Sequence, residues 1–419
     1  MTRKLTIVGG GSAYAPGLLK AFAAEADAFE GFEFVLMDLH ERELRIVEAL
    51  GRRLLDGTGI TLRATTDRRD AIAGADFVLT TFRQGGLEAR HLDESVPLQF
   101  GVIGQETIGP GGFFFAMRTL PVMRDIAAEM AELAPSAVLI NYSNPTQIVA
   151  EAITRHTDVT CVAICDQTDD DRSHLAQALG LAPTEIELEG VGLNHATWST
   201  KALIRGEDAL AVLQRERDAI HARSDVSNRT KRMVDLALRL QRVPNSYLQY
   251  YYAREATVAE AQAATKTRAQ IIQAELAGHY AHFAEQAEAD TPNLTQGRGG
   301  SVFGDFAVRV LRALATGERA RLTLNVPNAG RVLPDFDEER VVEVPCTVEG
   351  GTITPEPQQG FPHTKRGLLR MLADYQAASA DAIWHGDQDH LAEALALNPL
   401  VGSLDLADRL LAARPDLTS

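Results

Sequence analysis

The sequence predicts an α/β protein that begins with a Rossmann-like, doubly wound parallel sheet. Three observations predict it: short apolar runs alternate with helical periodicity over residues 1–165, the first run enters a glycine cluster, and the second ends in an acid. Strands buried on both faces between helices are typical of a parallel sheet. We expect strands at residues 5–8, 33–38, 60–64, 76–81, 137–141 and 160–165, with helices at 16–25, 41–55 and 117–133.

Residues 166–419 predict a second, mixed α+β domain for substrate binding and oligomerisation, after a nucleotide domain of residues 1–165. The whole arrangement would resemble that of lactate and malate dehydrogenases. Residues 180–200 indicate strands and turns, and 205–290 indicate long helices. Residues 289–300 are polar and glycine-rich, which favours a mobile loop. Strands at 321–327 and 341–348 would form a separate, smaller sheet, and helices at 365–385 and 390–397 would close the chain.

Composition excludes several classes of function. The formal net charge of -16 argues against nucleic acid and against anionic membrane surfaces, which both favour basic patches. Three cysteines are too few for a disulfide framework. No apolar run approaches the roughly 20 residues of a membrane span. We therefore expect a soluble, cytoplasmic enzyme with a small-molecule substrate.

The glycine cluster predicts a dinucleotide site. Glycines between a strand and a helix allow a tight turn and let pyrophosphate approach backbone N–H groups. The spacing departs from the usual fingerprint, because Tyr14 stands where a third glycine is common. An acid at the end of the second strand would bond the ribose of NAD and repel a 2′-phosphate. The alternative is a structural turn with a solvated acid. The candidate cofactor residues are Gly9, Gly10, Gly11, Ser12 and Asp38.

Cys165 and His195 form a candidate metal pair, because each could end a strand. Thiolate and imidazole suit Mn, Fe, Co or Zn better than Mg or Ca. Two protein ligands would leave coordination positions for a chelating diol. The alternative is a small core cysteine and a hydrogen-bonded structural histidine.

Two further residues are candidates for proton transfer. Asp166 adjoins Cys165 and would lie in the same crevice, although an acid there also suits a helix cap. Tyr247 begins the aromatic run YLQYYY, and a tyrosine near a metal could act as a base if its pKa were lowered. Aromatic packing is the alternative.

Polar residues elsewhere indicate a ligand site. Asn141 and Asn144 follow a predicted strand. The glycine-rich stretch 101–112, which contains Gln105, Glu106 and Thr107, is typical of a loop that lines a ligand site. Four cations are candidate phosphate ligands, with surface charge as the alternative: Arg83, Arg90, Lys266 and Arg268.

The pattern resembles glycoside hydrolase family 4, the NAD- and metal-dependent glycosidases. The matching elements run in order over most of the chain: TIVGGGSAY, residues 82–122, INYSNPTQIV, ICD, GLNH, SYLQYYY and VVEVPC. This family is an exception to two-carboxylate glycoside hydrolysis.

The resemblance implies a mechanism. NAD, held by the glycine turn, Asp38 and Arg83, would oxidise the sugar at C3, and a divalent metal, Mn first, would sit on Cys165 and His195. A base, Tyr247 with Tyr250 as the second choice, would take the C2 proton. Elimination from C1 and water addition would follow, and the hydride would return. The substrate residues would be Arg90, Asn144 and Arg268. Family members are usually dimers or tetramers.

The resemblance is nearest to the 6-phospho-β-glucosidase branch, through RQGGLEAR and SYLQYYY. Asp166, however, is similar to the general acid of the 6-phospho-α-glucosidases. The alternatives are therefore a 6-phospho-α-glucosidase or a family member acting on non-phosphorylated sugars. An NAD-dependent 2-hydroxy acid dehydrogenase and a noncatalytic NAD sensor are the other functions that the same fold would allow.

Overall fold

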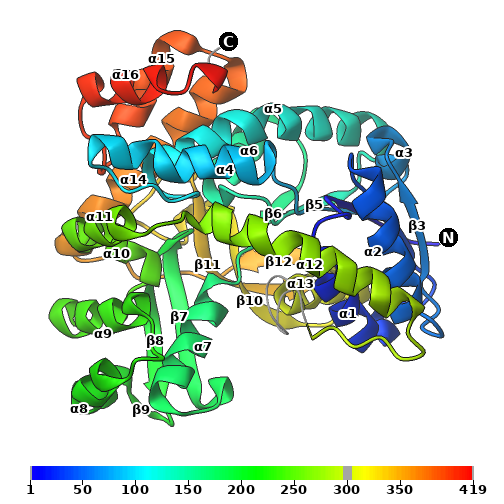
Figure 1. Cartoon of the computed structure of the whole chain (residues 1–419), viewed down its shortest axis with the longest axis horizontal. Coiled ribbons are helices and arrows are strands. Elements are labelled where there is room, and N and C mark those ends of the chain that lie inside the picture. Colours follow the sequence, from blue (N-terminus) through cyan, green and yellow to red (C-terminus); the bar gives the residue numbers. More distant parts are fainter. Residues whose placement is uncertain (1, 296–303, 418–419) are drawn as a thin grey trace.

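A computed structural model describes residues 2–295 and 304–417, and its centre is one mixed sheet of twelve strands (Figure 1). The predicted parallel half is confirmed, with the spatial order β3-β2-β1-β4-β5-β6. The order reverses between β1 and β4, which leaves a crevice beyond the carboxyl ends of these strands. The six strands are β1 (Lys4–Val8), β2 (Glu33–Met37), β3 (Thr61–Thr65), β4 (Phe77–Thr80), β5 (Val138–Asn141) and β6 (Cys161–Ala163).

Alternate residues of these strands feed two different cores, as period-two side chains require. On β2, Phe34 and Leu36 join the core that contains Phe22 of α1 (Ala15–Ala24). Val35 and Met37 join the opposite core, which contains Phe113 of α5 (Gly109–Leu133). Burial on both faces explains the nearly continuous apolar runs in the sequence.

The expectation of a separate, smaller sheet is wrong. The remaining strands continue the same sheet in the order β10-β11-β7-β8-β9, because Asn325 of β10 pairs antiparallel with Ala163 of β6. Strand β6 is the last strand of the parallel half, so its outer edge can pair with a strand from far along the chain. Local periodicity does not reveal which strand that is. These strands are β7 (Ile186–Leu193), β8 (Ala196–Ile204), β9 (Glu207–Asp208), β10 (Ala320–Pro327), β11 (Val341–Glu349) and β12 (Thr352–Pro355).

Helices cover both faces of the sheet (Figure 1). The predicted helix at 117–133 begins eight residues earlier, at Gly109, because three consecutive phenylalanines after the glycines are buried. The helices are α1 (Ala15–Ala24), α2 (Glu41–Leu54), α3 (Arg68–Ile72), α4 (Gly86–Ser95), α5 (Gly109–Leu133), α6 (Thr146–His156), α7 (Gln167–Leu179), α8 (Ala209–Ala222), α9 (Asn228–Leu240), α10 (Gln249–Tyr252), α11 (Arg254–Ala263), α12 (Arg268–Glu288), α13 (Asp305–Thr316), α14 (His363–His385), α15 (Gln388–Ala396) and α16 (Leu404–Ala412).

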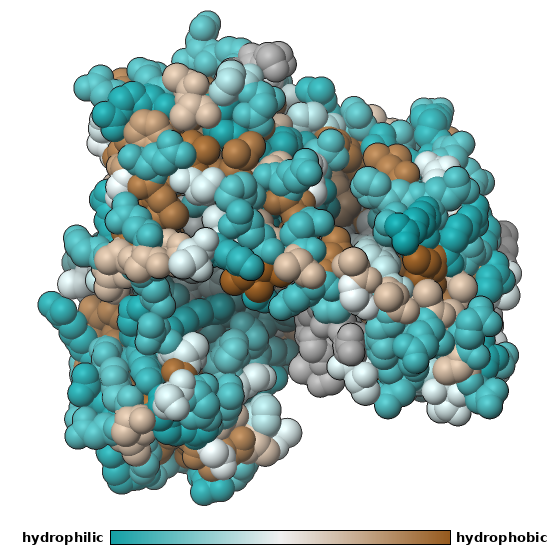
Figure 2. Space-filling view, viewed as in Figure 1, coloured by the Kyte–Doolittle hydropathy of each residue, from teal (hydrophilic) through white to brown (hydrophobic). Residues whose placement is uncertain are grey.

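The surface of the described residues is mostly hydrophilic on the face shown in Figure 2. None of the helices in the described ranges combines the length and apolarity that a bilayer crossing needs. The predicted mobile loop at 289–300 lies partly outside the described residues. The division at residue 165 stays a prediction.

Candidate active site

A cavity of about 530 Å³ lies at the carboxyl ends of the parallel strands, where the sheet order reverses. Its walls come from the β1–α1 turn, the ends of β2, β4 and β5, the segment after β6, the β7–β8 turn and α12. Segments from the whole chain therefore meet at one place. The predicted residues that line it are Gly9, Gly11, Ser12, Asp38, Arg83, Asn144, Cys165, Asp166, His195 and Tyr247.

The glycine turn lies at one end of this cavity. Gly9 has φ +95°, and a Cβ there would lie 2.7 Å from the carbonyl carbon of Thr81. A Cβ on Gly10 would lie 2.8 Å from the Leu36 side chain. Only glycine allows this conformation and approach. The lack of side chains lets a ligand approach the backbone of this turn closely, as the pyrophosphate of a dinucleotide does in folds of this type.

Asp38 is tied to the glycine turn, so the alternative of a merely solvated acid does not describe it. One of its carboxylate oxygens accepts a hydrogen bond from the Gly11 N–H at 3.0 Å. The other accepts from the His40 N–H at 3.1 Å. Tyr280 of α12 donates to the Gly11 carbonyl at 2.7 Å, a contact that no sequence motif predicts.

Cys165 and His195 lie together: the distance from Cys165 Sγ to His195 Nε2 is 3.4 Å. Cys165 follows β6 by two residues, and His195 occupies the tight β7–β8 turn with φ +60°. Burial lowers the pKa of His195 to about 3, so its imidazole is neutral. Burial raises the pKa of the Cys165 thiol, and a bound cation would act in the opposite direction.

The hydrogen bonds around His195 determine which nitrogen faces Cys165. Thr107 Oγ1 donates to Gln105 Oε1 at 3.0 Å, so its oxygen is an acceptor toward His195 Nδ1 at 3.2 Å. A neutral imidazole then carries its hydrogen on Nδ1 and directs the Nε2 lone pair at Cys165. This is the tautomer that a metal ligand needs.

These two donors fit a transition metal. Within residues 2–295 and 304–417 there is no group of three or more His, Cys, Asp or Glu side chains placed to hold an ion. A metal on Cys165 and His195 would therefore keep positions for oxygen ligands from a substrate.

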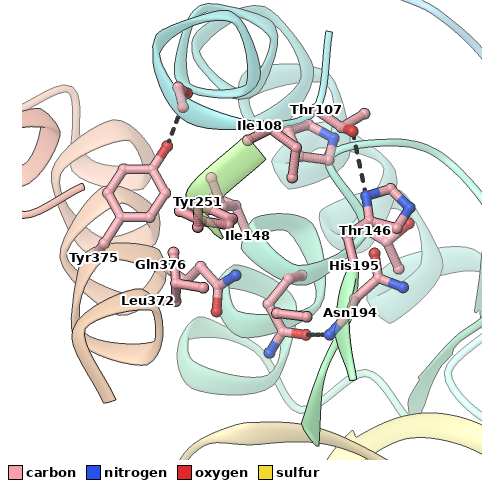
Figure 3. A pocket seen from close by; sticks show the side chains of 14 residues that line it. Thr107, Ile108, Thr146, Ile148, Asn194, His195, Tyr251, Leu372, Tyr375 and Gln376 are labelled. Atoms are coloured by element: carbon pink, nitrogen blue, oxygen red, sulfur yellow. Dashed lines mark hydrogen bonds between the residues drawn. The ribbon is translucent and has the colours of Figure 1, made fainter. Parts of the chain in front are cut away.

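A second, smaller cavity of about 30 Å³ lies behind His195 (Figure 3). His195, Thr107 and Tyr251 line it, together with Gln376 of α14. Asn194, which also lines it, donates from its side-chain amide to Glu343 of β11 at 2.9 Å and from its backbone N–H to Gln147 of α6 at 3.1 Å. The turn that carries His195 is thus anchored by two elements, α6 and β11.

Tyr247 stacks on the His195 ring, with centroids 4.1 Å apart and an interplanar angle of 11°. The Arg229 guanidinium carbon lies 4.9 Å from the centre of the Tyr247 ring. Burial raises the pKa of Tyr247, while Arg229 acts to lower it. Tyr250, the second choice of base, packs 5.8 Å from Tyr247 but does not line the larger cavity.

Asp166 occupies the N-cap position of α7, yet its side chain makes no capping hydrogen bond. The competing expectation of a helix cap is therefore not met. Its carboxylate instead hydrogen-bonds Tyr142, and burial raises the pKa of Asp166. A raised pKa of this kind is what a general acid needs.

The four candidate phosphate ligands lie in different places relative to the cavity. Arg83 lines the cavity, pairs with Glu106 and stacks on Phe115. Arg90 is buried behind it, where its guanidinium lies 3.0 Å from Glu106 and 2.7 Å from Glu94. The structure does not bring Lys266 and Arg268 into the cavity: both are exposed at the start of α12.

Asn141 does not reach the cavity either, because its amide is buried against Thr80 and Ser143. Asn144 does line it. Sequence reasoning missed Arg68, Tyr142, Arg229 and Tyr280. Tyr142 lies inside the recognised INYSNPTQIV motif, where Asn141 and Asn144 were singled out instead, while the other three lie on helices outside the recognised motifs.

The fold and the cavity together define a dinucleotide-binding α/β enzyme with a thiol–imidazole pair beside the cofactor cradle. The chain belongs to glycosyl hydrolase family 4: the model "Family 4 glycosyl hydrolase" matches residues 4–181, and "Family 4 glycosyl hydrolase C-terminal domain" matches residues 190–401. These two matches confirm the family that the sequence motifs predicted.

Several relatives are similar over nearly their whole length. The "Probable 6-phospho-beta-glucosidase" of Bacillus subtilis is 31% identical, with 97% of this chain and 94% of the relative covered. The "6-phospho-beta-glucosidase" of Escherichia coli is 31% identical, with 96% and 93% covered. The "Maltose-6'-phosphate glucosidase" of Bacillus subtilis is also 31% identical, again with 96% and 93% covered.

Several solved structures are also similar to this chain over nearly its whole length. A 6-phospho-alpha-glucosidase from gut microorganisms, in complex with NAD and Mn2+, has a TM-score of 0.87 at 25% identity, with 99% and 98% of the two chains covered. The same kind of enzyme with NAD and glucose-6-phosphate has a TM-score of 0.85 at 26% identity, with 100% and 98% covered. Lactate dehydrogenase from Eimeria maxima shares the fold, with a TM-score of 0.53 at 13% identity and 97% and 96% covered.

Proposed function

We propose that this protein is an NAD- and divalent-metal-dependent 6-phosphoglucosidase, with Mn as the first choice of metal. The observation that carries the proposal is the 3.4 Å distance between Cys165 Sγ and His195 Nε2, in the same cavity as the glycine turn. Relatives named as 6-phosphoglucosidases and similar structures that contain NAD, Mn2+ or glucose-6-phosphate support it.

The two bound groups would supply a hydride acceptor and a Lewis acid. The turn formed by Gly9, Gly10, Gly11 and Ser12 would let the pyrophosphate approach the backbone closely, and Asp38 would accept hydrogen bonds from ribose hydroxyls. Arg83 would contact the cofactor from the opposite wall. Cys165 and the Nε2 of His195 would ligate the metal.

Two groups would move protons on the sugar. Tyr247 would take the proton from C2, because its ring lies against His195 and so beside the metal position. Asp166 would give a proton to the leaving oxygen at C1, since burial favours its protonated form. Asn144 would hydrogen-bond the sugar hydroxyls from the end of β5.

A phosphorylated sugar needs a cation near its C6 end, and Arg83 is the proposed partner inside the cavity. Arg90 would act from behind, since it shares the Glu106 carboxylate with Arg83. Arg268 stays a proposed phosphate ligand only if another copy of the chain brings it to the cavity. We propose a homodimer or homotetramer in the cytoplasm.

The finer proposal is a preference for 6-phospho-β-glucosides. The relatives from Bacillus subtilis and Escherichia coli with that name, and the RQGGLEAR and SYLQYYY motifs, support it. Asp166 and the equally similar maltose-6'-phosphate glucosidase favour the α anomer instead.

The experiment is a panel of p-nitrophenyl glucosides, α and β, each with and without a 6-phosphate. It is run with NAD, Mn²⁺ and a thiol reductant, because oxidised Cys165 could not ligate as a thiolate. We expect turnover of the 6-phosphorylated members, and of the β anomer first. No turnover of any glucoside in the panel would refute the proposed glycosidase function. Net NADH production from a 2-hydroxy acid would favour the alternative, a 2-hydroxy acid dehydrogenase.

A further inference from the structure

Arg68 is a cation on the wall of the cavity that the proposed mechanism does not use. It is the first residue of α3 and lines the cavity with Asp38, His40 and Glu43, beyond the end of β2. In a sheet of this topology, the segment after β2 borders the adenosine half of a dinucleotide. Arg68 therefore lies where the ribose 2′ position would be recognised.

Glu129 of α5 holds the guanidinium of Arg68 with two parallel hydrogen bonds. Arg68 Nε lies 2.7 Å from Glu129 Oε2, and Arg68 Nη2 lies 2.8 Å from Glu129 Oε1. Side-chain exposure is 24% for Arg68 and 14% for Glu129. This bidentate geometry fixes the direction in which the guanidinium points, and the carboxylate of Glu129 offsets its positive charge.

Among the described residues at this end of the cavity, Arg68 is the arginine, and Glu129 offsets its charge. Asp38 and Glu43, which line the same end, are acidic. A 2′-phosphate brings about two negative charges and needs a bidentate arginine. Here the fork of Arg68 already bonds a carboxylate.

We infer that Glu129 is a specificity-determining residue, which withholds Arg68 from a 2′-phosphate and so, together with Asp38, selects NAD over NADP. The inference rests on the proposed use of a nicotinamide cofactor. It predicts that removing the charge of Glu129 releases Arg68 for the phosphate of NADP.

The chain offers a matched control. Arg69 and Glu132 form a second ion pair between the same two segments, at 2.6 Å, and neither residue lines the cavity. Glu132→Gln therefore makes the same charge change on the same helix α5, away from the site. Its effect measures what a change of helix charge does in general.

The test is calorimetric titration of the purified full chain with NAD and with NADP. The variants are Glu129→Gln, Glu129→Ala as a second form, Glu132→Gln, and Glu129→Gln combined with Arg68→Ala. Circular dichroism checks that each is folded. We expect Glu129→Gln to lower the ratio Kd(NADP)/Kd(NAD) by about tenfold, the value of one charge-assisted pair. Glu132→Gln should leave the ratio unchanged, and Arg68→Ala should abolish the gain.

Two negative results are distinguishable. If the wild type binds NAD and the ratio is the same in Glu129→Gln, Glu129→Ala and Glu132→Gln, the role of Glu129 is refuted while the proposed function stands. If the wild type binds neither nucleotide, the proposed function fails, and the inference fails with it.

Discussion

Thr107 is the residue that determines which nitrogen of His195 faces Cys165, and so whether His195 can act as the proposed metal ligand. It donates to Gln105 and accepts from His195 Nδ1, which leaves Nε2 directed at Cys165. Partners of this kind orient a metal-bound histidine and raise its basicity, and their loss costs about 10–100-fold in metal affinity or activity.

We predict that Thr107→Val weakens Mn²⁺ binding by about tenfold, because the two side chains have nearly the same shape and only the hydroxyl is lost. Electron paramagnetic resonance of free Mn²⁺ measures the affinity, and NAD affinity should not change. Thr200→Val, at an exposed position on β8, is the control. Equal Mn²⁺ affinity in Thr107→Val and wild type would contradict the assigned tautomer.

The role of Asp166 makes a prediction that depends on the leaving group. A general acid contributes about 10²–10⁴-fold, but little where the leaving group needs no proton. Asp166→Asn should therefore slow an alkyl 6-phosphoglucoside by at least about 100-fold and a nitrophenyl one far less. Steady-state kinetics with both substrates measures this. A uniform loss would show that Asp166 acts otherwise, for example only by supporting Tyr142.

Motifs predicted much of the site at this scale, because its chemistry lies at strand ends that follow recognisable sequences. Cys165, His195 and Tyr247 meet as the resemblance implied. Arg229 and Tyr280 were missed, since a residue on a remote helix has no local signal. Arg90 was placed in contact with substrate, but its position in sequence could not reveal two carboxylates around it.

At the scale of elements, helix α6 and strand β11 meet through a buried acid. Glu151 of α6 accepts a hydrogen bond from the Val341 N–H at 2.8 Å. Its neighbour Gln147 donates to the Val341 carbonyl at 2.6 Å. Burial raises the pKa of Glu151 to about 7. This contact joins the parallel half of the sheet to the half that carries His195.

The raised pKa of Glu151 predicts how stability changes with pH. Because the folded state binds the proton more tightly than the unfolded state, stability falls as pH rises from about 4.5 to 7. Above that window, the ionised Glu151 side chain lowers the free energy of unfolding by an amount on the order of 3 kcal/mol. Glu151→Gln should therefore be more stable than wild type at pH 8 and nearly equal at pH 4.5.

Urea denaturation at several pH values measures this difference. Glu349→Gln, at the exposed end of β11, should show no such pH-dependent gain. A Glu151→Gln protein that is less stable than wild type at pH 8 would contradict the buried, costly carboxylate.

Helices and strands could be predicted where the sequence of the element itself shows that it is buried. Strands β2, β4 and β5 of the parallel half have nearly continuous apolar runs, so their sequences identify them. The start of α5 was missed, because its glycines and proline predict a loop while tertiary packing of Phe113 favours a helix. The joining of β10 to β6 depends on one long-range pair, which no sequence window contains.

For the whole molecule, the site exists only because distant segments converge. The glycine turn precedes the β7–β8 turn by well over a hundred residues, and Tyr280 of α12 follows His195 of that turn by 85 residues, yet all three segments line one cavity. The hydrogen bond from Tyr280 to Gly11 joins residues 269 positions apart. Family 4 membership places this arrangement among enzymes that cleave glycosides, although the fold is also that of lactate dehydrogenase.

The most direct test of the account is hydrolysis of a 6-phosphoglucoside in D₂O with NAD and Mn²⁺, followed by proton NMR of the released glucose 6-phosphate. Because Tyr247 is the proposed base that removes the C2 proton, which solvent then restores, the account predicts deuterium at C2 of the product, and loss of both turnover and exchange in Tyr247→Phe. Hydrolysis that leaves the original hydrogen on C2 would contradict it.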